Sequence, residues 1–391
     1  MKPSAPTRNI ALLALAQALL LINGVTLVAV SSLVGLALAG DRRLATLPLT
    51  ALVVGTALAT LPAAYFMKRH GRRAGFMLGA AIGLVSALIC AQAAFQGQFW
   101  LLCGGLFGAG IYGAFGQQYR FAAADAVPIP WKSRAISLTL AGGIAGGVVG
   151  PELGKLTRGL MEAPFAATYL ALAVMAGIAL FVASRLEIPA LTAQEQQARG
   201  RPLRSIMSQP AYAVALLAAT AGYGVMNLLM TATPIAMDLC RHPFSEVAFV
   251  IEWHVIGMFA PSFFTGGLIR RFGVGRVMLT GAILMLACIA IAFSGLSVMH
   301  FWWALTLLGV GWNFLFIGGT TLLTETYRPE ERAKAQGAND FIVFAVQGLT
   351  SLSSGVMIST AGWHTLNLLA LPIVAVTGLT TGFWMYRRSN K

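Results

Sequence analysis

Apolar stretches alternate with short polar breaks along almost the entire chain. Each stretch is long enough to cross a bilayer as a helix, because a hydrocarbon core of about 30 Å needs about 20 apolar residues. The breaks between them are short and contain charged residues, Gly or Pro. The pattern predicts twelve transmembrane helices, over residues 10–33, 44–67, 74–95, 99–124, 135–156, 165–186, 210–238, 245–269, 275–296, 301–324, 335–359 and 363–386.

The composition agrees with this class of protein. Hydrophobic residues make up 57% of the chain, charged residues only 10%, and the mean hydropathy is +0.76. A soluble domain with so few charges would leave its surface uncovered. The first apolar stretch continues beyond the length of a signal-peptide core, so we expect an uncleaved first helix. The four cysteines show no CxxC spacing and are expected to be small buried side chains.

The positive charge is distributed in a way that predicts the topology. The chain has 27 Lys and Arg against 13 Asp and Glu. With the N-terminus inside, 21 of the 27 lie in the termini and loops on one side, five lie in loops on the other, and Arg120 lies within a span. This asymmetry predicts two cytoplasmic termini in a bacterial inner membrane. A nucleic-acid-binding protein would gather its basic residues on one face or tail, so no such partner is expected.

The longest polar break divides the helices into two sets of six. It covers residues 187–209, and predicts an N-terminal bundle over 1–186, a cytoplasmic linker, and a C-terminal bundle over 210–391. The halves echo each other at a shift of about 201 positions. For example, Met77-Leu78 matches Met278-Leu279, and Gly108-x-Gly110 matches Gly309-x-Gly311. Secondary transporters are built from related halves of this kind, which move about a site near the membrane midplane.

The loops after the second and eighth predicted helices carry related basic motifs. The first contains Lys68, Gly71 and Arg72, and the second contains Arg270, Gly273 and Arg276. These motifs, the helix count and the half-repeat resemble the major facilitator superfamily. The resemblance implies an all-α membrane protein with twelve transmembrane helices in two pseudo-symmetric six-helix bundles. In that family one position of this loop motif is an aspartate, which belongs to a charge network that closes the cytoplasmic gate. Here Lys68 and Arg270 occupy it, so that form of the network is absent.

A glycine-rich stretch in the fifth predicted helix allows two interpretations. Gly150 and Pro151 end a run of small residues at four-residue spacing, which resembles the Gly-Pro motif of drug/proton antiporters. That resemblance implies export. Close packing of this helix against the eighth predicted helix or another neighbour, with a bend at the proline, explains the same residues without any role in export.

Polar side chains inside the spans are the candidate substrate-binding residues, because they are costly in lipid and usually face a cavity or a partner. In the fourth predicted helix, Gln117 and Arg120 share one helical stripe with glycines. Snorkelling to the headgroups, or a salt bridge to Asp125, would also account for Arg120. Amides and aromatic rings in the other spans would suit a flat, partly polar solute. The full candidate set is Asn23, Tyr112, Gln117, Arg120, Tyr223, Asn227, Trp312, Asn313 and Gln347.

Three titratable residues in the spans are candidates for proton coupling. Glu252 is a lone carboxyl in an apolar span and is the first candidate, with a salt bridge to another helix, such as one to Arg120, as its competing role. Asp340, nearer a helix end, is the second. His254 lies two residues from Glu252, about 200° around a helix, so the two are not expected to act as a direct pair.

These features predict a proton-coupled secondary transporter, not an enzyme. No phosphate-binding loop, metal-ligand spacing or nucleophile–base pair appears, so neither cofactor nor metal is expected. The stretches around Arg120 and His254 resemble bacterial facilitator proteins that import riboflavin, and that resemblance implies uptake of a flat heterocyclic vitamin. A drug or metabolite exporter is the alternative. A sensor would normally carry a further soluble domain. The expected partners are a small-molecule substrate, a proton and the lipid bilayer, and the expected state is a monomer.

Overall fold

A computed structural model describes residues 5–39, 44, 47–188 and 200–389, and throughout these residues the regular structure is helical. The helices of the first half are α1 (Ala5–Leu38), α2 (Leu47–His70), α3 (Arg72–Gln96), α4 (Phe99–Gly116), α5 (Tyr119–Asp125), η2 (Ile129–Trp131), α6 (Lys132–Ala141), α7 (Ile144–Thr157) and α8 (Ala166–Ser184). Those of the second half are α10 (Leu203–Met207), α11 (Pro210–Leu239), α12 (Phe244–Phe259), α13 (Ser262–Phe272), α14 (Val274–Ser294), α15 (Val298–Leu323), η3 (Pro329–Glu331) and α16 (Arg332–Ser389).

The described helices confirm the predicted fold class. Eleven helical segments are long and apolar enough to cross a membrane, and α12 with α13 forms a further span bent by 41°. The segment labelled α16 contains two of these spans, because Gly362 interrupts it with φ 77° and ψ 173°. Within the described ranges, the protein is therefore an all-helical membrane protein with up to twelve spans.

Close contacts divide the chain into two compact units. Unit 1 comprises Met1–Val127, Gly142–Ala198 and Arg332–Phe341, and unit 2 comprises Pro128–Ala141, Arg199–Glu331 and Ile342–Lys391. The sequence-based division at the linker stays a prediction, and most of that linker (189–199) lies outside the described residues. By contacts, two short segments join the unit formed mainly by the other half: α6 belongs to unit 2, and the first turns of α16 belong to unit 1.

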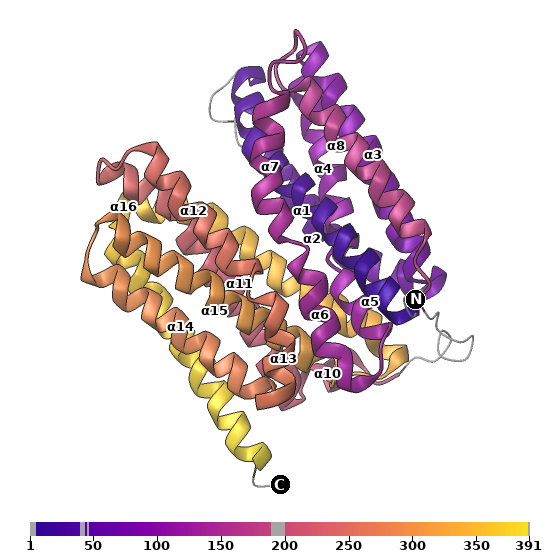
Figure 1. Cartoon of the computed structure of the whole chain (residues 1–391), viewed down its shortest axis with the longest axis vertical. Coiled ribbons are helices and arrows are strands. Elements are labelled where there is room, and N and C mark those ends of the chain that lie inside the picture. The colour runs from indigo at the N-terminus through magenta and orange to yellow at the C-terminus, as the bar shows by residue number, and fades with distance from the viewer. Residues whose placement is uncertain (1–4, 40–43, 45–46, 189–199, 390–391) are drawn as a thin grey trace. The chain divides into compact units, whose positions relative to one another are not determined.

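Each unit has its own helical core. In unit 1, α4 packs on α2 and α3, α3 packs on α8, and α1 packs on α7 (Figure 1). In unit 2, α15 lies among α11, α12 and α14, and α6 packs on α13 (Figure 1). Every residue of α15 from Gly311 to Leu323 is buried. Because lipid is as apolar as leucine, such helices associate through close packing and buried polar contacts more than through removal of apolar surface from water.

Both basic loops contain a glycine in the same unusual conformation. Gly71 has φ 86° and ψ 160°, and Gly273 has φ 87° and ψ 151°. Positive φ in this range strains residues that have a Cβ atom. Each glycine ends one helix and lies directly before the next, α3 and α14 respectively. The repeated sequence motif thus corresponds to a repeated backbone turn.

Candidate functional site

A buried polar network in unit 1 centres on Asp340. Asp340 lies eight residues into α16, about 12 Å along the helix at its usual rise, and its side chain has no exposed surface. One carboxylate oxygen accepts hydrogen bonds from the Arg120 guanidinium and, at 3.0 Å, from the Asn339 amide. The other oxygen accepts one from the Gln118 amide at 3.1 Å. The carboxylate is therefore paired with a cation and held by two further donors.

Arg120 is held on its other side by its own helical neighbourhood. Its guanidinium donates to the carbonyl of Gln117 at 3.0 Å and to the Gln117 side chain at 3.1 Å. The guanidinium carbon also lies 4.6 Å from the centre of the Phe121 ring. Arg120 forms an ion pair with Asp340, whereas Asp125 pairs with Arg72 and Arg332. The snorkelling alternative is wrong, because Arg120 is 1% exposed.

Arg72 extends this network to Asp125. Its guanidinium donates to the Asp125 carboxylate at 2.9 and 3.2 Å, to the Gln118 side chain at 2.8 Å and to Gln336 at 2.8 Å. Arg332 reaches the same oxygen of Asp125 at 3.1 Å. The turn at Gly71 directs Arg72, the first residue of α3, into this position. Lys68 replaces the acid of the family motif. Arg72, in the same motif, nevertheless has a carboxylate partner, Asp125 at the end of α5.

The network is costly to disturb. Its three arginines and two aspartates are mostly buried, with side-chain exposures from 0 to 16%. Removing one member of a buried ion pair typically costs about 3–5 kcal/mol, because the remaining charge is left without compensation. Gln118 donates to Asp340 and accepts from Arg72, so it links the two ion pairs. A change of charge at Asp340 would thus alter hydrogen bonding as far as Arg72.

The predicted stripe of the fourth helix is interrupted at this network. α4 ends at Gly116 and α5 begins at Tyr119, so Gln117 and Gln118 form the break. Gln118 is fully buried whereas Gln117 is partly exposed. The prediction assigned Gln117 but not Gln118 to the site. Both residues keep right-handed helical backbone angles, and the amide that is buried is that of Gln118, which the stripe did not include.

An aromatic cluster occupies the core of unit 2. Trp312 and Phe316 of α15 are stacked, with ring centres 5.1 Å apart at 15°. Tyr223 of α11 contacts both edge-on, at 5.2 and 4.9 Å, and Phe344 at 5.6 Å. Phe259 contacts Trp312 edge-on at 5.6 Å. The structure thus brings together two of the three predicted aromatic residues, Tyr223 and Trp312.

One polar atom in this cluster has no hydrogen-bond partner. Trp312 is 1% exposed, and its indole Nε1 has no acceptor within the described residues. A buried indole N–H usually has an acceptor, since leaving a buried donor unsatisfied costs about 1–3 kcal/mol. This N–H is therefore a buried donor without a partner among the described residues.

The amides of the other predicted binding residues mainly hold helices together. In α11, Asn227 donates to the carbonyl of Gln347 at 3.1 Å and to the Thr350 hydroxyl at 3.4 Å. In α1, Asn23 is buried and donates to the carbonyl of Leu172 in α8 at 3.2 Å. Tyr112 is buried over Gly83, where an added Cβ would lie 2.6 Å from the tyrosine ring. These contacts give each residue a structural role, while their predicted contact with substrate remains a prediction.

Asn313 stabilises the bend between α12 and α13. Its amide nitrogen donates to the carbonyl of Met258 at 2.7 Å and to the Ser262 hydroxyl at 2.6 Å, while its oxygen accepts from Thr265 at 2.7 Å. Pro261 lies at the bend and has no N–H to donate to the preceding turn. Asn313 therefore supplies hydrogen bonds where the helix interrupts its own.

The two candidates in α12 occupy opposite environments. Glu252 is exposed, on a surface where Trp253 is 38% exposed. His254 is fully buried, and its Nδ1 lies 2.7 Å from the carbonyl of Leu305. That contact is a hydrogen bond when Nδ1 carries the proton, and Nε2 then has no partner within the described residues. The expectation that the two residues do not form a direct pair is consistent with this placement.

The glycine-rich stretch of α7 packs against α1 within unit 1. An added Cβ at Gly146 would lie 2.5 Å from the side chain of Leu21, and one at Gly150 would lie 3.1 Å from Val25. Thr26 donates to the carbonyl of Gly150 at 2.9 Å, next to Pro151. The packing interpretation thus accounts for these residues, with α1 as the neighbouring helix.

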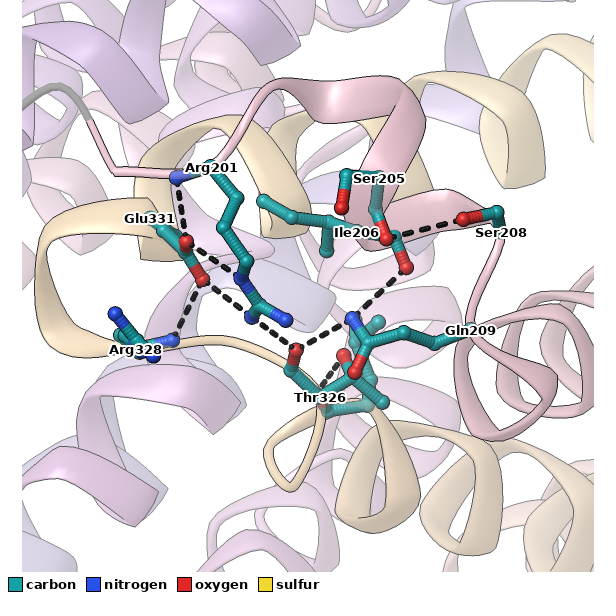
Figure 2. Close-up of polar contacts among 9 residues, drawn as sticks. Arg201, Ser205, Ile206, Ser208, Gln209, Thr326, Arg328 and Glu331 are labelled. Atoms are coloured by element: carbon teal, nitrogen blue, oxygen red, sulfur yellow. Dashed lines mark hydrogen bonds and ion pairs between the residues drawn. The ribbon is translucent and has the colours of Figure 1, made fainter.

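A second charged cluster lies at the linker end of unit 2 (Figure 2). Glu331 is fully buried and accepts hydrogen bonds from the backbone and side chain of Arg201, at 2.6 to 2.8 Å, and from the backbone of Arg328 at 3.0 Å. Arg201 and Gln209 also donate to the carbonyl of Thr326. The hydrogen bonds with Glu331 raise the pKa of the Arg201 guanidinium. The cluster anchors the end of the linker to the loop before α16.

Several residues of these clusters were not among the predicted site residues. They are Gln118, Gln336 and Asn339 around Asp340, and Phe259, Phe316 and Phe344 around Trp312. Gln336 and Asp340 are four residues apart and so lie on one helical face. This spacing could have indicated that Gln336 lies beside Asp340. The adjacent Gln117-Gln118 pair left open which amide faces inward.

A buried ion-pair network around Asp340 and an aromatic cluster around Trp312, both within membrane-spanning helices, are typical of a membrane transport protein, since such side chains usually mark a substrate or ion pathway. The family model of the Major Facilitator Superfamily matches residues 12–251 and 215–391. The chain belongs to the major facilitator superfamily, and it is a transporter, not an enzyme.

Individual relatives agree with this assignment. The chain is 42% identical over 376 residues to the riboflavin transporter RfnT of Brucella anthropi, covering 95% of this chain and 94% of the relative. It is 29% identical to the uncharacterized MFS-type transporter YddS of Bacillus subtilis, covering 92% and 87% of the two chains. A solved structure of the fucose:proton symporter FucP of E. coli has the same fold, with a TM-score of 0.80 at 16% identity, covering 97% of this chain and 99% of the symporter.

Proposed function

We propose that this transporter takes up riboflavin, or a similar flat heterocyclic vitamin, by proton-coupled alternating access. The similarity to a riboflavin transporter over nearly the full length of both chains supports this substrate class. The buried Asp340–Arg120 pair supports the coupling, and it is the single observation on which the mechanism depends. The setting is a bacterial inner membrane, with both termini in the cytoplasm and the protein acting as a monomer.

Coupling follows from the charge balance at Asp340. With Asp340 ionised, its carboxylate compensates Arg120 in a site without water access. A proton on Asp340 removes that compensation, and it also converts a carboxylate oxygen that accepts from Gln118 or Asn339 into a group that can donate. Arg120 is then available to an anionic or carbonyl group of the substrate. Proton binding and substrate binding thereby become linked through one side chain.

The aromatic cluster of unit 2 is the proposed stacking surface. An isoalloxazine ring is flat, aromatic and rich in carbonyl and imide groups. Edge-on and stacked rings provide the apolar surface for such a solute, and aromatic pairs contribute about 0.5–1.5 kcal/mol beyond burial. The unsatisfied indole N–H of Trp312 provides a hydrogen-bond donor that a ring carbonyl would accept.

Transport by purified protein in liposomes tests the proposal. With the outside acidic, we expect accumulation of labelled riboflavin that collapses when a protonophore removes the pH gradient. A Trp312→Phe variant keeps the ring stack but removes the N–H, and it should raise the KM for riboflavin about tenfold, the effect of one lost hydrogen bond in a desolvated site.

The same assay separates the proposal from its alternatives. A panel of other vitamins and of drugs is measured beside riboflavin in both directions. Accumulation of riboflavin that ignores the gradient would contradict proton coupling. Efflux of a drug in exchange for protons, with no riboflavin uptake, would favour the exporter.

A further inference from the structure

An open pocket lies in unit 2 where three helix ends meet. It has a volume of about 390 Å³ and is lined by the end of α13, the turn at Gly273, the start of α14 and the end of α16. The side chains that matter for its chemistry are Phe272, Arg276, Glu325, Trp384, Met385 and Arg388. None of these belongs to the polar network around Asp340 or to the aromatic cluster around Trp312.

The pocket lies at the level where the apolar spans end. The span of α14 begins at Val274, and the last span of the chain, Thr360–Arg388, ends at the pocket. Phe272 is the last residue of the bent span formed by α12 and α13. Residues at the ends of membrane-spanning helices lie among the lipid headgroups. The pocket therefore opens at the membrane surface.

Its charged residues leave a net positive charge. Arg276 is exposed and forms no ion pair or side-chain hydrogen bond within the described part of the chain. Arg388 pairs with Glu325 at 3.2 Å, but both side chains are about half exposed, at 60% and 45%. Exposed ion pairs contribute little, so Arg388 can exchange this partner for another anion at small cost. Two guanidinium groups, which match phosphate geometry, thus face one carboxylate.

An apolar wall accompanies these charges. Trp384 lies under the guanidinium of Arg388, with the ring centre 5.2 Å from its central carbon. Phe272 is 44% exposed at the pocket. A ligand held by its phosphate in the pocket could therefore lay an apolar tail against Phe272, which a free phosphate ion would leave uncovered.

We propose that this pocket binds the phosphate group of an anionic glycerophospholipid, with Arg276 and Arg388 as its ligands and the acyl chains against Phe272 at the pocket mouth. Trp384 supports the glycerol region. The backbone N–H groups at the start of α14 add donors to the same site, because Gly273 provides no side-chain cap. The site is separate from substrate transport as proposed above and does not depend on it.

Lipid binding to the delipidated protein in detergent tests this site. Dioleoylphosphatidylglycerol is titrated in, and the bound lipid is counted by native mass spectrometry. The variant is Arg276→Gln with Arg388→Gln. The matched control is Arg271→Gln with Arg387→Gln, which removes the same charge from two nearby side chains that do not line the pocket. Wild type and control should retain the lipid, while the site variant should bind it about tenfold more weakly.

Two results would overturn the proposal. Equal weakening in the control would show that diffuse surface charge attracts the lipid. Displacement of the lipid by millimolar inorganic phosphate would show a site for soluble anions. Arg276→Gln alone provides a second measurement should the double variant be unstable, because this exposed side chain forms no ion pair or hydrogen bond within the described residues. Unchanged lipid binding in that single variant would also contradict the assignment.

Discussion

Asp340 and Glu252 both carry a carboxyl group, but the two groups lie in different environments. Both are lone carboxyls in apolar stretches, and from sequence Glu252 is the stronger candidate because it lies nearer the middle of its span. The structure places Glu252 on an exposed surface and Asp340 in a fully buried ion pair. A carboxyl group that couples protons to a conformational change needs a partner, and the interaction energy with that partner has to depend on whether the carboxyl group is charged. Asp340 has that partner in Arg120.

Replacing Asp340 with Asn should uncouple transport. The change keeps the shape of the side chain but removes the titratable charge, so exchange of riboflavin across the membrane should persist while accumulation driven by a pH gradient is lost. Glu252→Gln, measured beside it in liposomes, should retain accumulation. The opposite pattern would assign coupling to Glu252.

Stability provides an independent readout of the same pair. Asp340→Asn leaves Arg120 uncompensated, which should cost about 3–5 kcal/mol and lower the melting temperature in detergent. Adding Arg120→Gln removes the uncompensated charge and should restore much of that loss. If the double variant melts no higher than the single one, the two side chains are not energetically coupled.

At the scale of helices, Asn313 is expected to be a structural residue of the α12–α13 bend. Asn313→Leu keeps the branched shape of the side chain and removes three hydrogen bonds, each worth about 0.6 kcal/mol on average inside membranes, so a loss of about 2 kcal/mol is expected. Asn367→Leu is the matched control, since Asn367 is equally buried and donates only to the carbonyl one turn before it. Thermal unfolding in detergent measures both, and equal losses would argue against a special role for the bend.

Hydropathy located the spans but not their interruptions. The stretch over 99–124 was expected to be one helix and forms one span, in which Gln117 and Gln118 keep helical backbone angles between α4 and α5; the stretch over 245–269 bends by 41° at Pro261. Window averages cannot detect such breaks, because the apolar composition on either side is unchanged. Pro261 is a residue type that indicates a bend, whereas Gln117 and Gln118 give no such indication.

The sequence indicated which residues belong to the candidate site, but it did not indicate which of them contact each other. Arg120 and Asp340 each stood out as charges inside a span, yet they are 220 positions apart, and one sequence contains no information on which cation meets which carboxylate. Trp312 and Tyr223 were likewise singled out from separate helices. Their contact depends on the tertiary packing of α11 on α15.

For the whole molecule, the distribution of charge makes a topological prediction. The 21 Lys and Arg on one side against five on the other predict that both termini and the linker lie in the cytoplasm. Reporter fusions after Arg204 and after Lys391 should both give a cytoplasmic signal. A fusion after Gly159, in the loop between α7 and α8, should give a periplasmic signal. A periplasmic signal at Arg204 or Lys391 would overturn the assignment.

The bend at Pro261 also bears on how the protein is made. Residues 244–272 leave the ribosome before residues 298–323, so the α12–α13 segment is synthesised ahead of the asparagine that completes its hydrogen bonds. In hydrocarbon, a backbone carbonyl without a donor costs several kcal/mol. The nascent segment therefore has to wait, either as a straighter helix or sheltered beside the insertion machinery, until α15 is available. Membrane insertion and tertiary folding of this half are thus coupled in time: the final shape of one helix is set only after a later helix has entered the bilayer.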